Sequence, residues 1–310
     1  MNFLIIDEMH KGLLKLLDEI GINGDYQPNI GKEEVADKLI GYDGFVVRSK
    51  VFVDQQLLEH ADRLKYVCRA GAGIDNLDVD YIESRGIKII NAPEGNRNAL
   101  AEHTVGLLFS LLNNIVKSDK EVKSMKWDRE GNRGNEIQGK TVGLIGYGFM
   151  GEAFASKMVH FGCKVIVYDK YKKNIIGKGV EQVELSEIFN KAEVLSIHVP
   201  LTDETRFMVN DEFLSKFKNP IWFINTSRGE VASLDSIKTN LLANRLLGVA
   251  LDVIENEKLN TFTDNQKKTF NELSSFDNVI LTPHVAGWSF ESYERINEVL
   301  VEKLKAEISA

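Results

Sequence analysis

Apolar and polar positions alternate along the chain with two different spacings, which predict strands and helices in turn. In the first third, short apolar runs are separated by segments with apolar residues at helical spacing. Strictly alternating strands and helices indicate a parallel sheet with helices on both faces. The predicted strands here are Phe3–Ile6, Phe45–Val47, Tyr66–Cys68 and Ile87–Ile90, and the predicted helices are Lys11–Glu19, Glu33–Ile40, Gln55–His60 and Val79–Ser84.

The same alternation returns between residues 141 and 284, so the fold class expected is α/β with two doubly wound parallel-sheet domains. A long apolar helix is predicted between the two halves, over Asn98–Val116, and its composition is typical of a crossover buried in a domain or subunit interface. The loop 126–139 follows, either as a surface loop or as a dimer arm anchored by Trp127. The predicted strands of the second half are Val142–Ile145, Val165–Tyr168, Val194–Ile197, Ile221–Ile224, Leu247–Leu251 and Val279–Leu281.

A glycine pattern after the first strand of the second half predicts a dinucleotide site. Gly146, Gly148 and Gly151 form G-x-G-x-x-G between a strand and a helix, and the next strand ends in Asp169. Such glycines allow a tight turn, close approach to a pyrophosphate at the helix N-terminus, and close packing of helix on strand. The acid suits a ribose diol and therefore NAD. An ordinary tight turn without a ligand is the alternative, and Lys170 with its neighbouring lysines weakens the preference for NAD over NADP.

Composition mainly excludes classes of protein. The chain has 310 residues, of which 43% are hydrophobic and 27% charged, as expected of a two-domain globular protein. Its formal net charge of −8 disfavours general binding to nucleic acid or anionic membranes. No apolar run is long enough for a membrane span, and Asp7 and Glu8 interrupt the first run, so no signal peptide is expected. Cys68 and Cys163 are expected as reduced thiols buried in strands, which favours the cytoplasm.

A second glycine pair, Gly71 and Gly73, follows the third predicted strand. It lacks a third glycine, and the next strand ends at Asn91 without an acid, so a dinucleotide is not expected there. Backbone amides in such a turn can bind a small carboxylate.

Among the six histidines, His284 is the candidate acid–base group. It follows a predicted strand at the carboxyl end, where ligands of open α/β sheets bind. Four of the others are assigned by context: His198 ends a buried strand, and His60, His103 and His160 fall in helical patterns, where structural or surface roles are expected.

Arg228 also follows a predicted strand, and its guanidinium suits a carboxylate or an α-keto acid. A carboxylate is needed to orient the histidine, and the candidates are Asp252, Glu255 and Glu257.

Several segments together resemble the D-isomer-specific 2-hydroxyacid dehydrogenases, over nearly the whole chain. They include RAGAGIDNLD, GKTVGLIGYGFMG, NTSRGE, LDVIENE and LTPHVAG. NAPEGNRNALAEH and WDREGNRG are most similar to the short 3-phosphoglycerate dehydrogenases without a regulatory domain, and the chain's end at Ala310 agrees with that expectation.

The resemblance implies a domain organisation. A flavodoxin-like substrate domain, residues 1–95 and 286–310, would hold an inserted Rossmann coenzyme domain, residues 96–285, with two crossing helices as the hinge. Domain closure would exclude water, and a homodimer would form through the coenzyme domain.

The resemblance also implies site residues. Arg228, Glu257 and His284 would be catalytic, although Lys258 stands where the family usually has proline after the acid. The amides of Ala72 and Gly73 would bind the substrate carboxylate, with Arg48 and Ser49 near its far end. No metal is expected. The coenzyme contacts would be Gly146, Gly148, Phe149, Met150, Gly151, Asp169, His198, Pro200, Thr205, Thr226, Asp252 (for the nicotinamide carboxamide) and Gly287.

The activity expected is NAD-dependent hydride transfer at C2 of a D-2-hydroxy acid, with 3-phosphoglycerate in serine biosynthesis as the first candidate. Arg48, Lys50 and Arg69 favour a phosphorylated substrate, although all three could face solvent. Reduction of glyoxylate, hydroxypyruvate or another 2-keto acid is the alternative. A non-catalytic NAD(H)-sensing scaffold that binds protein partners is the alternative of another class.

Overall fold

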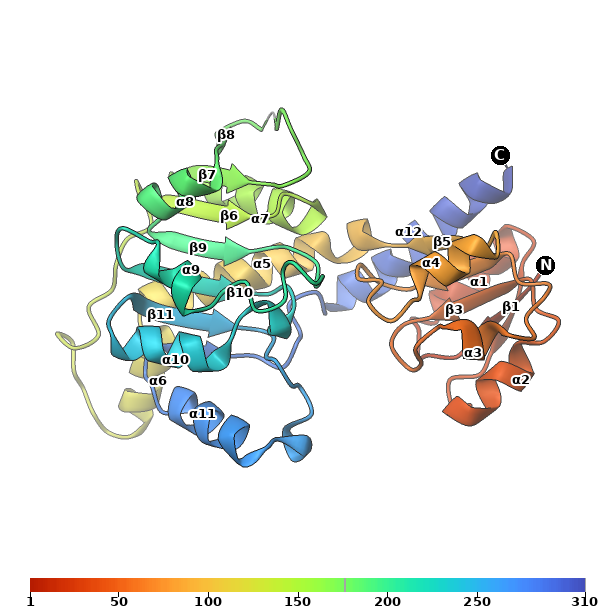
Figure 1. Ribbon diagram of the computed structural model, residues 1–310, viewed down its shortest axis with the longest axis horizontal. Helices are drawn as coiled ribbons and strands as arrows, with labels where there is room; N and C mark the ends of the chain where they lie inside the picture. Colours follow the sequence, from red (N-terminus) through yellow and green to blue (C-terminus); the bar gives the residue numbers. More distant parts are fainter. Residues whose placement is uncertain (176, 310) are drawn as a thin grey trace. The chain divides into compact units, whose positions relative to one another are not determined.

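The computed structural model describes residues 1–175 and 177–309, in two compact units (Figure 1). The first unit is discontinuous, comprising Met1–Ala99 and Trp288–Ala310, and the second is Leu100–Gly287. Ala310, which was used in the expectation about a regulatory domain, lies outside the described residues. Both units are parallel-sheet α/β structures, so the predicted fold class is confirmed.

The first unit is built on a five-stranded parallel sheet with the strand order β2-β1-β3-β4-β5. This is the flavodoxin-like order, and its switch point lies between β1 and β3. The strands are β1 (Asn2–Ile5), β2 (Asn23–Tyr26), β3 (Gly44–Val47), β4 (Tyr66–Arg69) and β5 (Lys88–Asn91).

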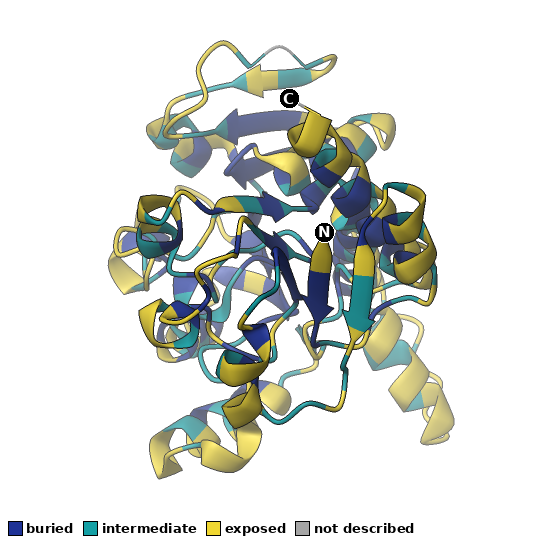
Figure 2. Ribbon diagram, turned by 90° about the vertical axis from the view of Figure 1, so that its right-hand side faces the viewer, coloured by how far each residue is buried: buried dark blue, intermediate teal, exposed yellow. Residues whose placement is uncertain are grey.

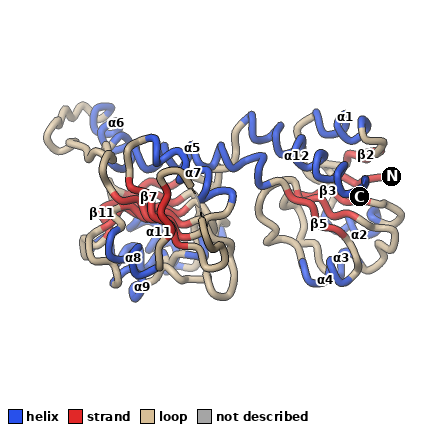
Figure 3. The backbone as a smooth tube through the Cα atoms, turned by 90° about the horizontal axis from the view of Figure 1, so that it is seen from above, coloured by secondary structure: helices blue, strands red, loops and turns tan. Residues whose placement is uncertain are grey.

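Helices cover both faces of this sheet because successive strand side chains point to opposite sides (Figures 2 and 3). Phe3 and Ile5 face α1 and α12, whereas Leu4 and Phe45 face the remaining helices. The helices are α1 (Gly12–Glu19), η1 (Lys32–Glu34), α2 (Val35–Leu39), α3 (Gln55–Leu58), α4 (Val79–Ser84) and α12 (Phe290–Ser309).

The second unit contains a seven-stranded parallel sheet with the order β12-β11-β10-β9-β6-β7-β8. Read from β8, this is the Rossmann order with one further strand, and the switch point lies between β6 and β9. The strands are β6 (Thr141–Ile145), β7 (Lys164–Tyr168), β8 (Val180–Gln182), β9 (Val194–Ile197), β10 (Ile221–Asn225), β11 (Leu246–Leu251) and β12 (Val279–Leu281).

One face of this sheet packs against α5 and α7, and the other against α8 to α11. Helix α5 begins at Pro93 in the first unit and ends at Leu112 in the second. The helices are α5 (Pro93–Leu112), α6 (Ile115–Lys123), α7 (Phe149–His160), α8 (Leu185–Lys191), α9 (Asp211–Ser215), η2 (Gly229–Val231), α10 (Leu234–Leu242), η3 (Leu259–Thr261) and α11 (Asp264–Ser274).

Two local predictions are wrong. The helix expected over Asn98–Val116 is two helices, because the chain turns at Asn114, whose φ of 51° is left-handed. Cys163 lies in the turn before β7 and is partly exposed, whereas Cys68 is buried in β4 as expected. Within the described ranges, no single helix is long and apolar enough to cross a membrane; α5 and α6 reach that threshold only as a pair bent by 61°.

Candidate active site

The turn after β6 has the shape that a dinucleotide requires. Gly146 has φ of 92°, and a side chain there would collide with the His198 carbonyl oxygen at 2.3 Å. A side chain at Gly151 would meet the Gly146 carbonyl oxygen at 2.2 Å, so α7 packs directly on the turn. Gly148, by contrast, has open space around it at the start of α7. Gly146 and Gly151 are therefore closely packed against the protein, whereas Gly148 leaves the backbone accessible to a ligand. NAD fits this turn.

Asp169 stands at the end of β7, beside that turn. Its carboxylate accepts backbone N–H bonds from Tyr147 at 2.7 Å, Tyr171 at 2.9 Å and Lys172 at 2.8 Å. Burial alone would raise the pKa of Asp169, but these three amides outweigh burial and lower it. Asp169 is thus ionised and held at the position where an acceptor for a ribose diol is expected.

His198 follows β9 and supports the glycine turn from below. Its ring nitrogen Nε2 lies 2.9 Å from the Ser196 hydroxyl, and the ring packs on Phe154 of α7. Burial lowers the pKa of His198 to about 3, so the ring is neutral. The ring faces the interior, and a contact between His198 and coenzyme stays a prediction.

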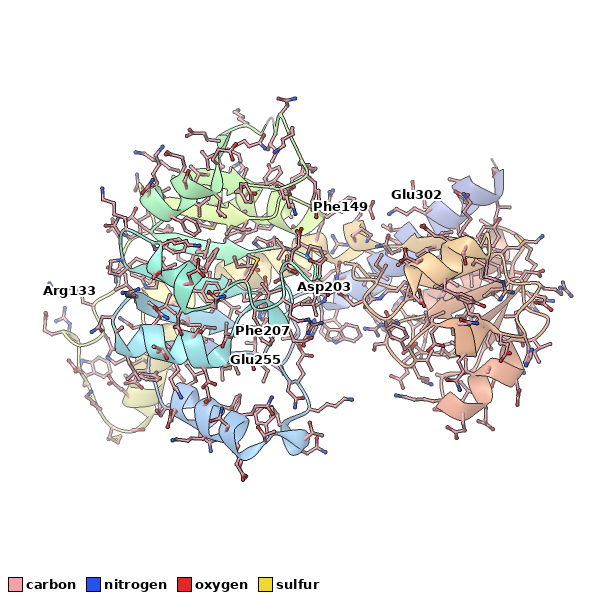
Figure 4. All side chains as sticks on the ribbon, in the orientation of Figure 1. Arg133, Phe149, Asp203, Phe207, Glu255 and Glu302 are labelled. Carbon is pink, nitrogen blue, oxygen red and sulfur yellow. The ribbon has the colours of Figure 1, made fainter. Side chains whose placement is uncertain are left out.

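The surrounding loops complete the edge where β6 and β9 end. Phe149 is 41% exposed at the start of α7, and Figure 4 places it with Asp203 at the end of the sheet to which the strands point. Thr205 donates to the Pro200 carbonyl oxygen at 2.7 Å and so closes the loop after β9. Met150 is partly buried in the first turn of α7.

Arg228 is presented by a short turn after β10. The buried side chain of Asn225 accepts from the Ser227 N–H at 3.0 Å and donates to the Arg228 carbonyl oxygen at 2.9 Å. The Arg228 guanidinium also donates to the Ser227 carbonyl oxygen at 2.7 Å. Asn225 was not predicted from the sequence, where its only signal is an amide side chain at the end of an apolar strand. Thr226, in the same turn, is 4% exposed and its hydroxyl lies 3.2 Å from that of Thr104.

His284 and Glu257 form the acid–base pair of the site. His284 Nδ1 lies 2.9 Å from the Glu257 carboxylate. Their side chains are 49% and 46% exposed. The hydrogen bond to Glu257 raises the pKa of His284, against burial and the Arg228 guanidinium, which lower it. Glu257 and Arg228 therefore both lie close enough to His284 to affect its pKa.

The other two candidate acids have different partners. Glu255 accepts the Leu234 N–H at 2.6 Å, and burial raises its pKa (Figure 4). Asp252 is 1% exposed, and its carboxylate accepts from the Thr282 hydroxyl at 2.6 Å and from the amides of Val285 and Ala286 at 2.9 and 2.8 Å. These bonds hold the turn that carries His284, and Gly287 ends it. The predicted contact of Asp252 with a carboxamide stays a prediction.

The turn after Glu257 is stabilised by the backbone N–H of Lys258, a donor that a proline at this position would not have. Lys258 donates its N–H to the Asn256 side-chain oxygen at 3.0 Å, and its carbonyl oxygen accepts from Thr261 at 2.8 Å. Asn256 therefore replaces the rigidity of a proline with an Asx-type turn.

In the first unit, Arg48 follows β3 at the switch point of the five-stranded sheet. Its guanidinium lies over the Trp288 ring, 4.1 Å from the centroid, and 5.6 Å from the Tyr293 centroid. The Arg48 backbone N–H donates to the Asp7 carboxylate at 2.7 Å. Burial lowers the pKa of Arg48, opposed by Tyr293 and Asp7. Arg48 is thus a cation held against a pair of adjoining aromatic rings.

The neighbours of Arg48 are arranged differently. Lys50 donates to the carbonyl oxygens of Pro28 and Ile30, the latter at 3.4 Å, so its ammonium holds a loop. Ser49 is exposed. In the predicted carboxylate-binding turn, the Ala72 carbonyl oxygen accepts from Asn91 at 2.8 Å, and Gly73 is partly exposed.

Comparisons with known proteins show the family and the fold of this chain. Residues 105–286 match the family described as D-isomer specific 2-hydroxyacid dehydrogenase, NAD binding domain. Hydroxypyruvate reductase of Thermotoga maritima is 32% identical over 303 residues, 98% of this chain and 96% of that protein. D-3-phosphoglycerate dehydrogenase of Methanocaldococcus jannaschii is 32% identical over 98% of this chain, which spans only 57% of that protein.

Among solved structures, D-lactate dehydrogenase from Aquifex aeolicus, complexed with NAD and lactic acid, superposes with a TM-score of 0.84 at 28% identity. The match covers 99% of this chain and 96% of that one.

Proposed function

Because the chain belongs to the D-isomer-specific 2-hydroxyacid dehydrogenase family, we propose that it transfers a hydride between NAD and C2 of a D-2-hydroxy acid. The observation that carries this proposal is the pair of His284 Nδ1 and the Glu257 carboxylate, 2.9 Å apart. The pair lies beyond the carboxyl ends of the sheet whose turn at Gly146 fits a dinucleotide. The coenzyme and acid–base chemistry thus share one rim.

The proton is handled at His284 Nε2. Since Nδ1 faces Glu257, Nε2 is the ring nitrogen left for the substrate oxygen. In oxidation, neutral His284 accepts the hydroxyl proton at Nε2, and in reduction the imidazolium returns it to the carbonyl oxygen. Glu257 stabilises the imidazolium, which favours the reductive direction at neutral pH.

Arg228 would orient the substrate, because its planar fork can bond the carboxylate and polarise the carbonyl together. The coenzyme, when bound, supplies the hydride donor or acceptor. The amides of Ala72 and Gly73 would hold the substrate carboxylate from the first unit. The first unit is accordingly the substrate domain and the second the coenzyme domain.

For the substrate, 3-phosphoglycerate and 3-phosphohydroxypyruvate are the first candidates, as in serine biosynthesis in the cytoplasm. Arg48, fixed at the switch point of its sheet, would meet the phosphate. A second candidate is the reduction of hydroxypyruvate or glyoxylate. The hydrogen bonds from Lys50 to two backbone carbonyls favour this second candidate. They engage the Lys50 ammonium, which is one of the three cations expected to bind a phosphate.

A panel of acids separates the two candidates. We expect kcat/KM with NADH to be at least about tenfold higher for 3-phosphohydroxypyruvate than for hydroxypyruvate, glyoxylate or pyruvate, since a charged hydrogen bond to Arg48 is worth about 1.5–3 kcal/mol. Arg48→Lys keeps the charge but loses the planar fork. It should lower the ratio of kcat/KM for 3-phosphohydroxypyruvate to kcat/KM for the unphosphorylated acids. A wild-type preference for an unphosphorylated acid would replace the first candidate with the second.

We also propose a homodimer through the coenzyme domain. Trp127 and Met125 are 80% and 95% exposed, in a segment that Lys117 and Asn132 fix by hydrogen bonds of 2.6 Å to Gly131 and Glu121. Ordered, exposed apolar side chains are typical of an interface. Figure 4 places Arg133, in the same loop, away from the strand ends that carry the site. Sedimentation should give a dimer for the wild type and a monomer for Trp127→Glu; a monomeric wild type would contradict this.

A further inference from the structure

Helix α5 contacts the strand ends of the coenzyme sheet through two successive side chains. His103 Nε2 lies 3.2 Å from the Thr282 hydroxyl, in the turn that carries His284. The next residue, Thr104, lies 3.2 Å from the Thr226 hydroxyl, in the turn that carries Arg228. One helix therefore contacts both turns that present the proposed catalytic groups.

The direction of the hydrogen bonds follows from the chemistry of the Thr282 hydroxyl. This hydroxyl has one proton, and it donates that proton to Asp252 Oδ1 at 2.6 Å. Its oxygen can therefore only accept from His103, so Nε2 of His103 carries a hydrogen. The same nitrogen lies 3.6 Å from Asp252 Oδ1, where a hydrogen-bond donor is favourable. The neutral ring is accordingly the Nε2–H tautomer.

Asp252 connects Thr282 to the turn that carries His284. Its backbone carbonyl oxygen accepts the His284 N–H at 2.8 Å, while its carboxylate binds two further amides of the turn. His284 has φ of 55°, a left-handed conformation that costs a non-glycine residue about 1–3 kcal/mol. The contacts with Asp252 hold His284 in this conformation and thereby aim its ring at Glu257.

We propose that His103 is a positioning residue for His284: its Nε2–H fixes the Thr282 hydroxyl on the buried Asp252 carboxylate, and Asp252 fixes the turn. His103 is 27% exposed, and among the described residues its hydrogen bond is to Thr282 and not to either of the proposed acid–base groups. The effect on turnover rests on the proposed function, whereas the tautomer and the coupling to His284 do not.

Removing the His103 N–H donor should weaken the support of the His284 turn without removing any of the proposed catalytic residues. Without His103, the Thr282 hydroxyl can rotate away from Asp252, and the His284 turn loses part of its support. The groups that face His284 are Glu257, Asp252 and Arg228. Because the hydrogen bond to Glu257 has the largest effect on the His284 pKa, a looser turn weakens its influence most.

The test compares three variants of the full chain. His103→Leu removes the donor, and His103→Gln restores an N–H near the same place. His160→Leu is the matched control, because His160 is an exposed helical histidine whose Nδ1 bonds only to Ser156 of its own helix. The measurements are kcat and its pH dependence for keto-acid reduction, the NADH dissociation constant, the melting temperature, and imidazole 15N NMR.

We expect His103→Leu to lower kcat about tenfold and to move the basic limb of the pH profile to lower pH by about half a unit, with NADH affinity within about twofold. His103→Gln should recover both, and His160→Leu should change neither. NMR should find neutral wild-type His103 as the Nε2–H tautomer, and a shifted His284 resonance in His103→Leu.

Each contrary result is decisive. An Nδ1–H tautomer for His103, or an unmoved His284 resonance, overturns the positioning role. A drop in kcat without a shift of the limb, and without recovery in His103→Gln, means simple packing and overturns it too. A wild type that reduces no 2-keto acid removes the proposed function, while the NMR result still decides the positioning.

Discussion

Two histidines follow the carboxyl ends of strands in the same sheet, and their surroundings give them opposite properties. His198, after β9, is 9% exposed, bonds Ser196, and has its pKa lowered by burial to about 3. His284, after β12, is half exposed and faces Glu257, which raises its pKa. The difference teaches that a strand-end position does not make a histidine an acid–base group. Access to solvent and a carboxylate partner do.

The backbone reinforces this difference. His198 continues its strand and donates its N–H to Ile145 at 2.8 Å, so it joins β9 to β6 beneath the glycine turn. His284 leaves its strand in a left-handed conformation that Asp252 maintains. In the proposed function, the rim beyond β6 and β9 therefore binds the coenzyme, and the rim beyond β11 and β12 moves the proton.

The largest expected effect comes from removing the proton carrier. His284→Asn keeps a residue type that tolerates positive φ, so the turn should survive. We expect the kcat of reduction to fall about 10³-fold, the typical contribution of an acid–base group, with NADH affinity within about twofold. Stopped-flow turnover and fluorescence titration measure the two quantities. Turnover like that of the wild type would remove His284 from the mechanism.

Removing the partner should have a smaller effect and a specific signature. In the proposed mechanism reduction needs protonated His284, so the rate of reduction should fall as the pH rises through the His284 pKa. Glu257 raises that pKa, and Glu257→Gln should therefore move the basic limb of the kcat profile to lower pH. At pH 7.5 we expect a loss of about 10- to 100-fold.

Asp235→Asn is a suitable control for Glu257→Gln, because Asp235 caps no catalytic turn and bonds Thr269 at 2.6 Å. An unmoved limb in Glu257→Gln, with kcat reduced, would mean that Glu257 orients the ring without tuning its pKa.

The sequence predicted this comparison only in part. Buried strands such as β6 and β9 are continuous apolar runs and were predicted within a residue or two, whereas β2, with the polar sequence NGDY, pairs only at the sheet edge and was missed. His284 was found because polar residues that follow strands are visible locally. The role of His103 was not found, because Thr282 lies 179 positions away and no local pattern joins them.

Buried contacts of charged residues were equally invisible in the sequence. Lys50 reads as a free cation beside Arg48, but in the fold it binds backbone carbonyls of a distant loop. Asp252 reads as a strand-end acid like Glu257, but it is buried by the turn that it holds. Composition and spacing predicted which strand ends carry the candidate residues, and only packing distinguished the buried supporting residues from the exposed candidates.

The smallest effect is expected from His198, and it concerns stability. An unfolded chain protonates this histidine below about pH 6.5, whereas the folded chain keeps it neutral to about pH 3. The stability from neutral His198 is therefore complete above pH 6.5 and is lost as the pH falls toward 3. Between pH 7 and 5.5 the free energy of unfolding should fall by about 1 kcal/mol through this group.

Urea unfolding of the wild type and of His198→Gln at both pH values measures this change. We expect the variant to be less stable at pH 7, because glutamine fits the histidine site imperfectly, but its stability should fall less between the two pH values. His60→Gln, at an exposed histidine, should keep the wild-type dependence. Equal acid dependence in the wild type and His198→Gln would show that His198 is protonated in the folded state, and the contrast with His284 would then disappear.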